Sequence, residues 1–235
     1  DVGAESARTN RNVITVVEEV DRFREFLEAW KWMVKRVDPV DGAQVWPPVV
    51  SANTWRPEVV SAVLEMGVEL VNDMGGLPNA RNARSCAEAG AALLIMHTVG
   101  EPKVAHTEVR WDDVLDEMRR FFRMKLALAE SAGLSEDRVV LDPGIDFAKQ
   151  RADNLRVFAG LEALGSFERP ILLPVSRKTV IGDVLGIEDP ADRDAGTVGC
   201  LAAGVLQGAH VFRMHHVAAG WQALKVLHAV ERMRN

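Results

Sequence analysis

The chain has 235 residues, of which 48% are apolar and 26% are charged, a composition typical of a globular protein with one sizeable core. Its 34 acidic and 28 basic residues are interspersed, giving a formal charge of −6, which argues against a nucleic-acid-binding surface. Cys86 and Cys200 lie far apart with no zinc-ligand spacing, and no apolar run reaches the roughly 20 residues that cross a bilayer. We therefore expect one soluble, cytoplasmic domain over residues 1–235, without membrane segments or a disulfide framework.

Six short aliphatic runs alternate with longer amphipathic stretches along the chain. In order, the runs are residues 49–53, 69–73, 92–97, 139–142, 171–175 and 210–215. Their apolar residues are continuous, which is typical of parallel strands buried on both faces. The stretches between them, such as 111–132, have helical spacing, and Gly67, Gly90, Gly133 and Gly208 each precede a strand, where a helix end needs a left-handed residue. This order predicts an α/β fold with crossover helices.

Each of the six runs ends in polar side chains. These are Asn53, Asn72 with Asp73, His97, Asp142, Ser176, and Arg213 with His215. In a parallel barrel such ends gather at one mouth. An open doubly wound sheet would bind its ligand mainly at one switch point, but the chain has no GxGxxG or Walker loop to mark one. The pattern therefore favours a (β/α)₈ barrel.

Seven short motifs occur in a fixed order over essentially the whole chain. They are DVGAESAR at 1–8, SANT at 51–54, VND at 71–73, MH at 96–97, DPG at 142–144 with Phe147 and Lys149, SRK at 176–178 and RMH at 213–215. Together they resemble the strand-end motifs of the dihydropteroate synthases, the pterin-binding (β/α)₈-barrel enzymes of folate biosynthesis. Taken singly, Asp142 before Pro-Gly is a turn former and Asn72 a helix cap, while Lys178 and Arg213 are surface charges. The joint pattern favours the family.

The resemblance implies a transferase that condenses 6-hydroxymethyl-7,8-dihydropterin pyrophosphate with p-aminobenzoate, giving 7,8-dihydropteroate and pyrophosphate. The pterin ring has adjacent N–H donors, and the Asp142 carboxylate is suited to accept both. Asn72 can donate and accept at once, which suits the mixed ring edge. Lys178 can donate to the pterin carbonyl or a ring nitrogen, and Asn53 can orient the ring. Met96 is assigned to the substrate-binding residues through its motif.

The leaving pyrophosphate requires cations and hydrogen-bond donors. Arg213 and His215 match the family's pyrophosphate contacts, and together with Lys178 they form the expected catalytic set, since charge stabilisation usually contributes most to catalysis. Arg8, Phe147 and Thr179 match positions that border the p-aminobenzoate pocket. The resemblance also implies small-molecule substrates, Mg²⁺ and a homodimer.

The chain departs from the family pattern at several positions near the expected site. Asn53 stands where the family usually has Asp, so the positive charge that develops on the dihydropterin is not offset and a reduced rate is expected. Asp146 replaces a Gly before Phe147. The other departures are Ala7 for Thr, Thr9-Asn10 for Pro-Gly, Pro174-Val175 for a Gly-containing pair, and His216 for Asp. The retained polar set indicates a divergent branch rather than decay.

The first motif corresponds to the family's second strand. A first strand and helix, about 40 residues by the usual size of a βα unit, are therefore expected upstream, and the barrel in the printed sequence is expected to lack its first βα unit. The Asn that helps to hold Mg²⁺ in the family lies in that segment. No metal ligand is accordingly assigned within residues 1–235.

Two other functions remain open from the sequence. A non-catalytic pterin-binding paralogue is favoured by Asn53 and by the altered second loop, the segment that carries Ala7, Thr9 and Asn10. A methyltetrahydrofolate methyltransferase uses a similar barrel, but residues 176–178 and 213–215 fit the synthase better. An assay of pyrophosphate release with and without p-aminobenzoate separates these functions.

Overall fold

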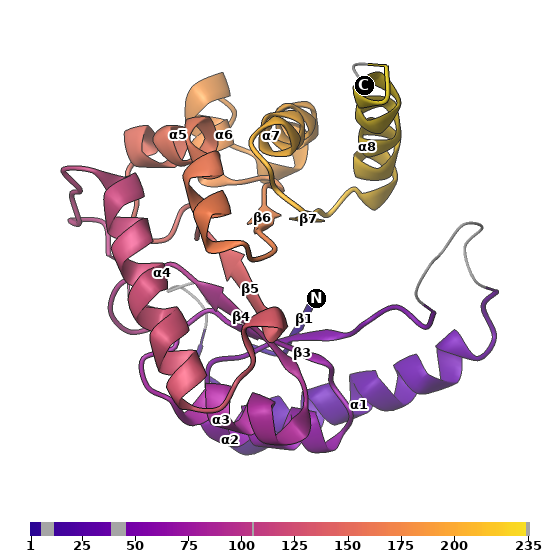
Figure 1. Ribbon diagram of the computed structural model, residues 1–235. Helices are drawn as coiled ribbons and strands as arrows, with labels where there is room; N and C mark the ends of the chain where they lie inside the picture. The colour runs from indigo at the N-terminus through magenta and orange to yellow at the C-terminus, as the bar shows by residue number, and fades with distance from the viewer. Residues whose placement is uncertain (6–11, 39–45, 105, 234–235) are drawn as a thin grey trace. The chain divides into compact units, whose positions relative to one another are not determined.

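The computed structural model describes residues 1–5, 12–38, 46–104 and 106–233 (Figure 1). The chain divides into two compact units. The first contains Asp1–Ala105 and Met124–Val140, and the second contains His106–Arg123 and Leu141–Asn235. Helix α4 (Val114–Ser131) and strand β5 (Val139–Asp142) contribute residues to both. No helix among the described residues is long and apolar enough to cross a membrane.

The first unit is a parallel sheet with helices along one of its faces (Figure 1). Its strands β1 (Val2–Gly3), β2 (Ser51–Asn53), β3 (Leu70–Asp73) and β4 (Ala92–Met96) are neighbours in chain order, and β5 continues that order. The helices are α1 (Val16–Val34), α2 (Pro57–Glu65) and α3 (Arg81–Ala89), and the 3₁₀ turn η1 (Glu136–Arg138) precedes β5.

Local sequence sets where these helices begin and how they pack. Thr15 caps α1, because its Oγ1 accepts a hydrogen bond of 3.1 Å from Glu18 N, and Pro57 occupies the first turn of α2, where a missing N–H has no cost. Apolar residues three or four apart, such as Phe23 and Leu27, face a core that also contains Val59, Val63 and Ala52. Burial of this apolar stripe holds the helices on the sheet.

The second unit repeats the strand-helix order. Its strands β6 (Leu172–Pro174) and β7 (Val211–Arg213) are parallel, and Leu141 of β5 bridges Ile171 beside β6. The helices are α5 (Arg151–Ala159), α6 (Thr179–Leu185), α7 (Asp194–Leu206) and α8 (Val217–Glu231), with 3₁₀ turns η2 (Leu161–Phe167) and η3 (Pro190–Arg193). At Gly204 a Cβ would lie 2.6 Å from Leu173 and 2.8 Å from Phe212, so only glycine allows α7 to pack this closely.

The predicted elements agree with the structure. All six aliphatic runs contain a strand, and the helix expected at 111–132 spans 114–131. Gly67, Gly90, Gly133 and Gly208 have φ of 92°, 67°, 88° and 84°, which confirms the left-handed helix ends. One expectation is wrong: β7 is not buried on both faces, since Val211 is 45% exposed. Among the described residues β7 pairs with β6 alone, and a strand with one neighbour is less enclosed.

Candidate functional site

The carboxyl ends of β2 and β3 place two asparagines side by side in the first unit. Asn53 closes β2, and Asn72 lies opposite it in the parallel register. Asn72 is 5% exposed, and its Nδ2 donates a hydrogen bond of 3.2 Å to Asp1 Oδ1. The side-chain oxygens of both asparagines are buried and have no hydrogen-bond partner among the described residues. A buried acceptor without a donor is costly, so the pair suits a ligand that presents N–H groups.

Asp73 follows Asn72 directly but holds the local backbone. Its Oδ1 accepts a hydrogen bond of 2.8 Å from Gly75 N, and its Oδ2 accepts one of 2.8 Å from Asn82 Nδ2. Burial raises the pKa of Asp73 to about 6, although both hydrogen bonds favour the ionised form. Its contacts therefore assign Asp73 to the turn after β3.

Three further predicted positions belong to the first unit. Met96 and His97, at the end of β4, are buried. Arg8, expected at the border of the p-aminobenzoate pocket, lies outside the described residues. The substitutions at Ala7, Thr9 and Asn10 lie outside them as well.

A buried ion-pair network in this unit was missed from the sequence. Arg56, which precedes α2, contacts Glu5 of the first motif and donates from Nη1 to Glu19 Oε2 at 3.1 Å. Lys103 Nζ donates to Glu5 Oε1 at 2.8 Å. Burial, the largest influence, raises the pKa of Glu19. The network ties the first motif to α1, α2 and the segment after β4, and no sequence pattern marked Arg56 or Lys103 as its cations.

In the second unit, Asp142 ends β5 as a buried carboxylate that is 3% exposed. Its Oδ1 accepts a hydrogen bond of 2.7 Å from Gly144 N, which is the turn-forming role, and this bond uses one of its two oxygens. Burial raises the pKa of Asp142 to about 6, while the hydrogen bond and the charges of Lys178, Lys149 and Arg213 act in the opposite direction. Asp142 is therefore a desolvated acceptor surrounded by cations.

Two lysines are held by the loop that follows Asp142. Lys178 Nζ donates to Ile145 O at 2.8 Å and lies 5.3 Å from the centroid of the Phe147 ring. Lys149 Nζ donates to Gly144 O at 3.0 Å and to Phe147 O at 3.1 Å. Burial lowers the pKa of Lys178, and it lowers that of Lys149 to about 7. The unit thus offers a carboxylate acceptor with a nearby ammonium donor, a pairing suited to a heterocycle with donors and acceptors on adjacent atoms.

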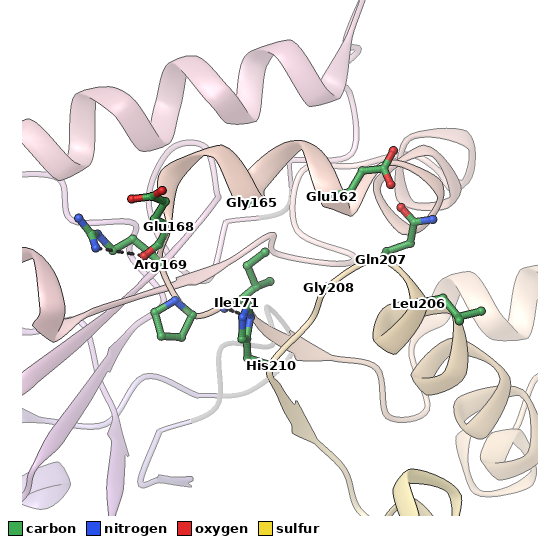
Figure 2. A pocket seen from close by; sticks show the side chains of 10 residues that line it. Glu162, Gly165, Glu168, Arg169, Ile171, Leu206, Gln207, Gly208 and His210 are labelled. Carbon is green, nitrogen blue, oxygen red and sulfur yellow. Dashed lines mark hydrogen bonds between the residues drawn. The ribbon is translucent and has the colours of Figure 1, made fainter. Parts of the chain in front are cut away.

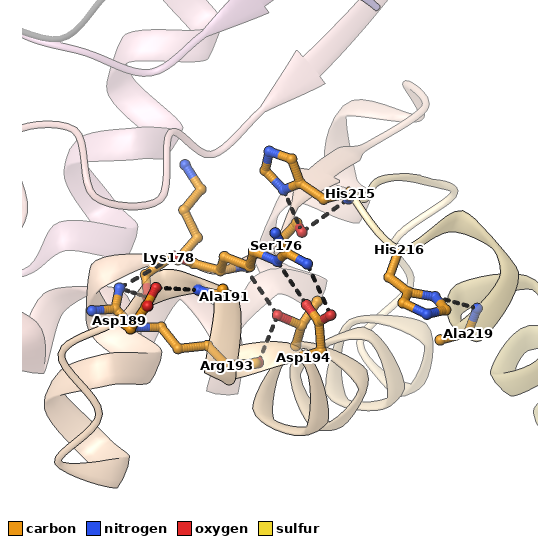
Figure 3. A network of polar contacts seen from close by, with 11 residues as sticks. Ser176, Lys178, Asp189, Ala191, Arg193, Asp194, His215, His216 and Ala219 are labelled. Carbon is orange, nitrogen blue, oxygen red and sulfur yellow. Dashed lines mark hydrogen bonds and ion pairs between the residues drawn. The ribbon is translucent and has the colours of Figure 1, made fainter.

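Ser176 joins the ends of β6 and β7 (Figure 3). Its Oγ accepts a hydrogen bond of 3.0 Å from His215 N and lies 2.7 Å from His215 Nδ1. Arg213 lies opposite Pro174 in the register of the two strands. Both Arg213 and His215 are exposed, so an anionic ligand can reach them. The two predicted pyrophosphate contacts are therefore brought together at one strand end.

The loop that carries Lys178 is fixed by Arg193, a residue that the sequence did not single out. The Arg193 guanidinium donates to Arg177 O, Lys178 O, Ile187 O and Glu188 O at 2.6 to 3.3 Å. Figure 3 shows the Lys178 side chain extending away from this guanidinium. Asp194, the next residue, accepts two hydrogen bonds from Arg177, at 2.8 and 3.0 Å. Arg193 thus positions Lys178 through its backbone.

We expect Arg193→Met to destabilise the protein and to weaken binding of the pterin that the sequence resemblance implies. The change removes a buried charged donor and leaves four carbonyls short of a partner, at a cost of about 3 kcal/mol of unfolding free energy. Urea unfolding and calorimetric titration with a pterin measure the two effects. Arg120→Met, at an exposed ion pair of α4, is the matched control and should change stability by less than about 0.5 kcal/mol. Wild-type stability in Arg193→Met would contradict this role.

A cavity of about 620 Å³ lies at the opposite ends of the strands in the second unit (Figure 2). It is lined by η2, the segment before β6 and the segment before β7. Within it, His210 Nδ1 accepts a hydrogen bond of 3.1 Å from Ile171 N. These residues lie before the strands, whereas Arg213 ends β7 and Ser176, Lys178 and His215 follow the ends of β6 and β7. The cavity is therefore separate from the candidate site.

Comparison with known proteins gives a consistent result. The family model described as pterin binding enzyme matches residues 1–215. Dihydropteroate synthase of Escherichia coli (strain K12) is 32% identical over 229 residues, which cover 97% of this chain and 77% of that protein. Dihydropteroate synthase of Synechocystis sp. is 30% identical over 99% of this chain and 76% of that protein.

Solved structures extend the likeness to the fold. Dihydropteroate synthase from Thermus thermophilus, in complex with 4-aminobenzoate, superposes with a TM-score of 0.84 at 34% identity, covering 97% of this chain and 82% of that one. The Clostridium difficile enzyme, in the presence of pteroic acid, superposes with a TM-score of 0.83 at 28% identity, covering 96% and 79%. The predicted (β/α)₈-barrel fold is confirmed. The chain belongs to the pterin-binding enzyme family and, within it, to the dihydropteroate synthases, which are transferases.

Proposed function

We propose that the protein condenses 6-hydroxymethyl-7,8-dihydropterin pyrophosphate with p-aminobenzoate to form 7,8-dihydropteroate and pyrophosphate. The observation that carries the proposal is Asp142, a carboxylate buried at a strand end among Lys178, Lys149 and Arg213. Burying a carboxylate is unfavourable unless it has partners, and within the described part of the chain one of its oxygens is used, for a turn. The remaining capacity suits the paired N–H donors of a pterin.

Four side chains are assigned to the pterin ring. Asp142 accepts from the amino and ring N–H groups, and Lys178 donates to the ring carbonyl or a ring nitrogen. Asn72 and Asn53 supply side-chain oxygens that have no partner among the described residues. Met96 is assigned to the same substrate, and its support is its motif and its position at the end of β4.

The reaction requires charge stabilisation at the leaving group. The nitrogen of p-aminobenzoate bonds to the pterin methylene carbon as the bond from that carbon to the pyrophosphate oxygen breaks, and the amine proton is lost. Arg213 and His215 are exposed at the end of β7, so they can contact pyrophosphate as negative charge grows on it. Lys178 adds a further cation near the ring. Such preorganised charges are typically the largest contribution to catalysis.

The second substrate is assigned to Phe147, Thr179 and Arg8. The support for Phe147 is that its ring lies against the Lys178 ammonium. The support for Thr179 is that it follows Lys178 directly in the chain. The support for Arg8 is its motif alone. The solved Thermus thermophilus enzyme contains 4-aminobenzoate, which supports the same class of second substrate here.

Mg²⁺ is proposed for this reaction from the family resemblance. Within residues 1–5, 12–38, 46–104 and 106–233, no group of three or more His, Cys, Asp or Glu side chains is placed to hold a metal ion. These side chains by themselves do not form a magnesium site, so the steps above are assigned to the chain's own groups. A homodimer is likewise proposed from the resemblance. A cytoplasmic location and a single pterin-binding domain over residues 1–235 are proposed from the cysteine pattern and the composition.

A pyrophosphate-release assay tests the proposal. Full-length gene product is supplied with the dihydropterin pyrophosphate, with p-aminobenzoate added or omitted, and with or without a chelator. Release that requires p-aminobenzoate supports the synthase, and its loss on chelation supports Mg²⁺. Pterin binding without release would instead identify a non-catalytic pterin-binding paralogue, the alternative that Asn53 favours. Absence of both would overturn the proposal.

We expect Asn53→Asp to raise turnover by roughly tenfold while changing pterin affinity less, because the added charge acts mainly on the cationic transition state. Steady-state kcat and calorimetric Kd measure the two effects separately. Asn79→Asp, which adds a carboxylate at an exposed position before α3, is the control. Equal or lower turnover would show that this branch is adapted to the amide.

A further inference from the structure

Asp146, where the family usually has Gly, has an unusual backbone conformation. Its φ is 68°, in the left-handed region that glycine adopts freely and that side chains other than Asn and Asp rarely adopt. The position therefore keeps the glycine geometry but adds a carboxylate. Asp146 lies in the loop that follows Asp142, between Ile145 and Phe147, the two residues that Lys178 contacts.

The carboxylate of Asp146 connects three segments of the second unit. Its Oδ2 accepts a hydrogen bond of 2.5 Å from Thr179 N, and its Oδ1 accepts one of 3.3 Å from Val180 N. Asp146 N donates to Asn154 Oδ1 at 2.8 Å, and Asn154 Nδ2 donates back to Asp146 Oδ1 at 3.3 Å. The loop after β5, the first turn of α6 and helix α5 are therefore held at one side chain.

Lys178 lies within the span of these contacts. Its Nζ donates to Ile145 O and lies near the Phe147 ring, and these two residues flank Asp146. Asp146 in turn accepts from the amide of Thr179, the residue after Lys178. Both ends of the lysine side chain are thus held against the same short piece of loop.

The charges around the Lys178 ammonium come from three elements. Asp142 of β5 and Asp146 of the loop are negative, whereas Lys149 of the loop and Arg213 of β7 are positive. Burial lowers the pKa of Lys178, and the Asp146 and Asp142 carboxylates oppose that shift. Removal of either carboxylate leaves the ammonium with an excess of like charge around it.

We propose that Asp146 is a positioning residue that holds Lys178, charged and in place, beside Asp142 for contact with the pterin ring. The inference rests on the proposed function, since it takes Lys178 and Asp142 as pterin contacts. It assigns a role to a substitution that distinguishes this chain from the family pattern. It also explains why a left-handed position carries a side chain.

The test compares Asp146→Asn and Asp146→Gly by calorimetric titration with 6-hydroxymethyl-7,8-dihydropterin pyrophosphate across pH 6 to 10. Both replacements tolerate a left-handed φ, so both should fold. We expect Asp146→Asn, which keeps an acceptor but loses the charge, to move the alkaline loss of affinity down by about one pH unit. Asp146→Gly should show the same shift together with a roughly tenfold weaker Kd at pH 7.

Lys178→Met supplies the background that isolates the coupling. In that variant, adding Asp146→Asn should cause no further loss and no shift, because the group through which Asp146 acts is gone. Asp183→Asn, an exposed carboxylate on α6, is the matched control and should leave the profile unchanged.

The outcomes separate this inference from the proposed function. If the wild type does not bind the pterin, the proposed function and the positioning role of Asp146 are both wrong. If the wild type binds and Asp146→Asn leaves the pH profile in place, or if the loss persists in the Lys178→Met background, the positioning role is wrong while the proposed function stands. A lower melting temperature without a pH shift would mark Asp146 as a structural residue only and would also overturn the inference.

Discussion

Asp142→Asn should strongly weaken pterin binding and at the same time make the folded protein more stable at neutral pH. The amide keeps the shape of the carboxyl group and can still accept from Gly144 N, but it cannot accept from two ligand N–H groups at once. In a desolvated site this costs roughly 2 to 4 kcal/mol, or about 30- to 1,000-fold in Kd. Calorimetry with a pterin at pH 7.5 measures the loss.

The gain in stability follows from the raised pKa of Asp142, about 6 in the folded protein against an ordinary value of 3.8. Between these values the folded protein holds a proton that the unfolded chain has released. The stability contribution of this group is therefore fully present below pH 3.8 and is lost as the pH rises through about 6. Asparagine stays neutral and should recover about 2 to 3 kcal/mol at pH 7 and none at about pH 3.5.

Thermal unfolding at pH 7 and at about pH 3.5 tests the effect on stability. Asp112→Asn, at an exposed carboxylate, is the control, and it should change neither the pterin affinity nor the stability. Wild-type affinity for the pterin should also fall about tenfold for each unit below about pH 6, since the protonated carboxyl group no longer accepts from both donors, and the variant should lack this limb. Unchanged affinity in a folded Asp142→Asn protein would remove Asp142 from the site.

Arg213→Met should lower kcat by about 10²- to 10³-fold while changing KM for the dihydropterin pyrophosphate by less than about tenfold. Charge on the leaving pyrophosphate is greatest in the transition state, so a cation at that group acts mainly on kcat. The exposed position of Arg213 at the end of β7 means that folding should be unaffected. Steady-state pyrophosphate release measures both constants, and circular dichroism confirms the fold.

Two companion variants sharpen the result. Arg213→Lys keeps the charge but loses the paired donors, so it should recover only part of the rate. Arg232→Met, in the C-terminal cap of α8, should leave kcat unchanged. Because the Arg213 charge also lowers the pKa of Asp142, the acid limb of pterin binding should move to higher pH in Arg213→Met. Equal kcat in Arg213→Met and wild type would exclude Arg213 from the chemistry.

The fold class, the positions of the strands and the family could all be predicted from the amino-acid residues alone. Continuous apolar runs predict buried strands, and glycines after helical stretches predict left-handed helix ends. Both signals depend on residues that are close together in the sequence, so no tertiary contact is needed to recognise them. The clustering of the polar strand ends could also be predicted, because parallel strands bring their carboxyl ends to the same edge whatever the sequence between them. Asn72, Asp142 and His215 were placed at strand ends on this basis alone.

Three-dimensional contacts were needed to distinguish the polar residues that support the chain from those that remain available to a ligand. Asp73 and Asn72 are adjacent in sequence, yet Asp73 is engaged by Asn82 and Gly75, whereas the Asn72 side-chain oxygen has no partner among the described residues. Arg193 and Asp146 have no distinguishing sequence pattern for their roles, since their partners lie up to 34 residues away. Such roles depend on contacts between distant segments, and the free energy of a buried polar group is set by those contacts rather than by the residue type.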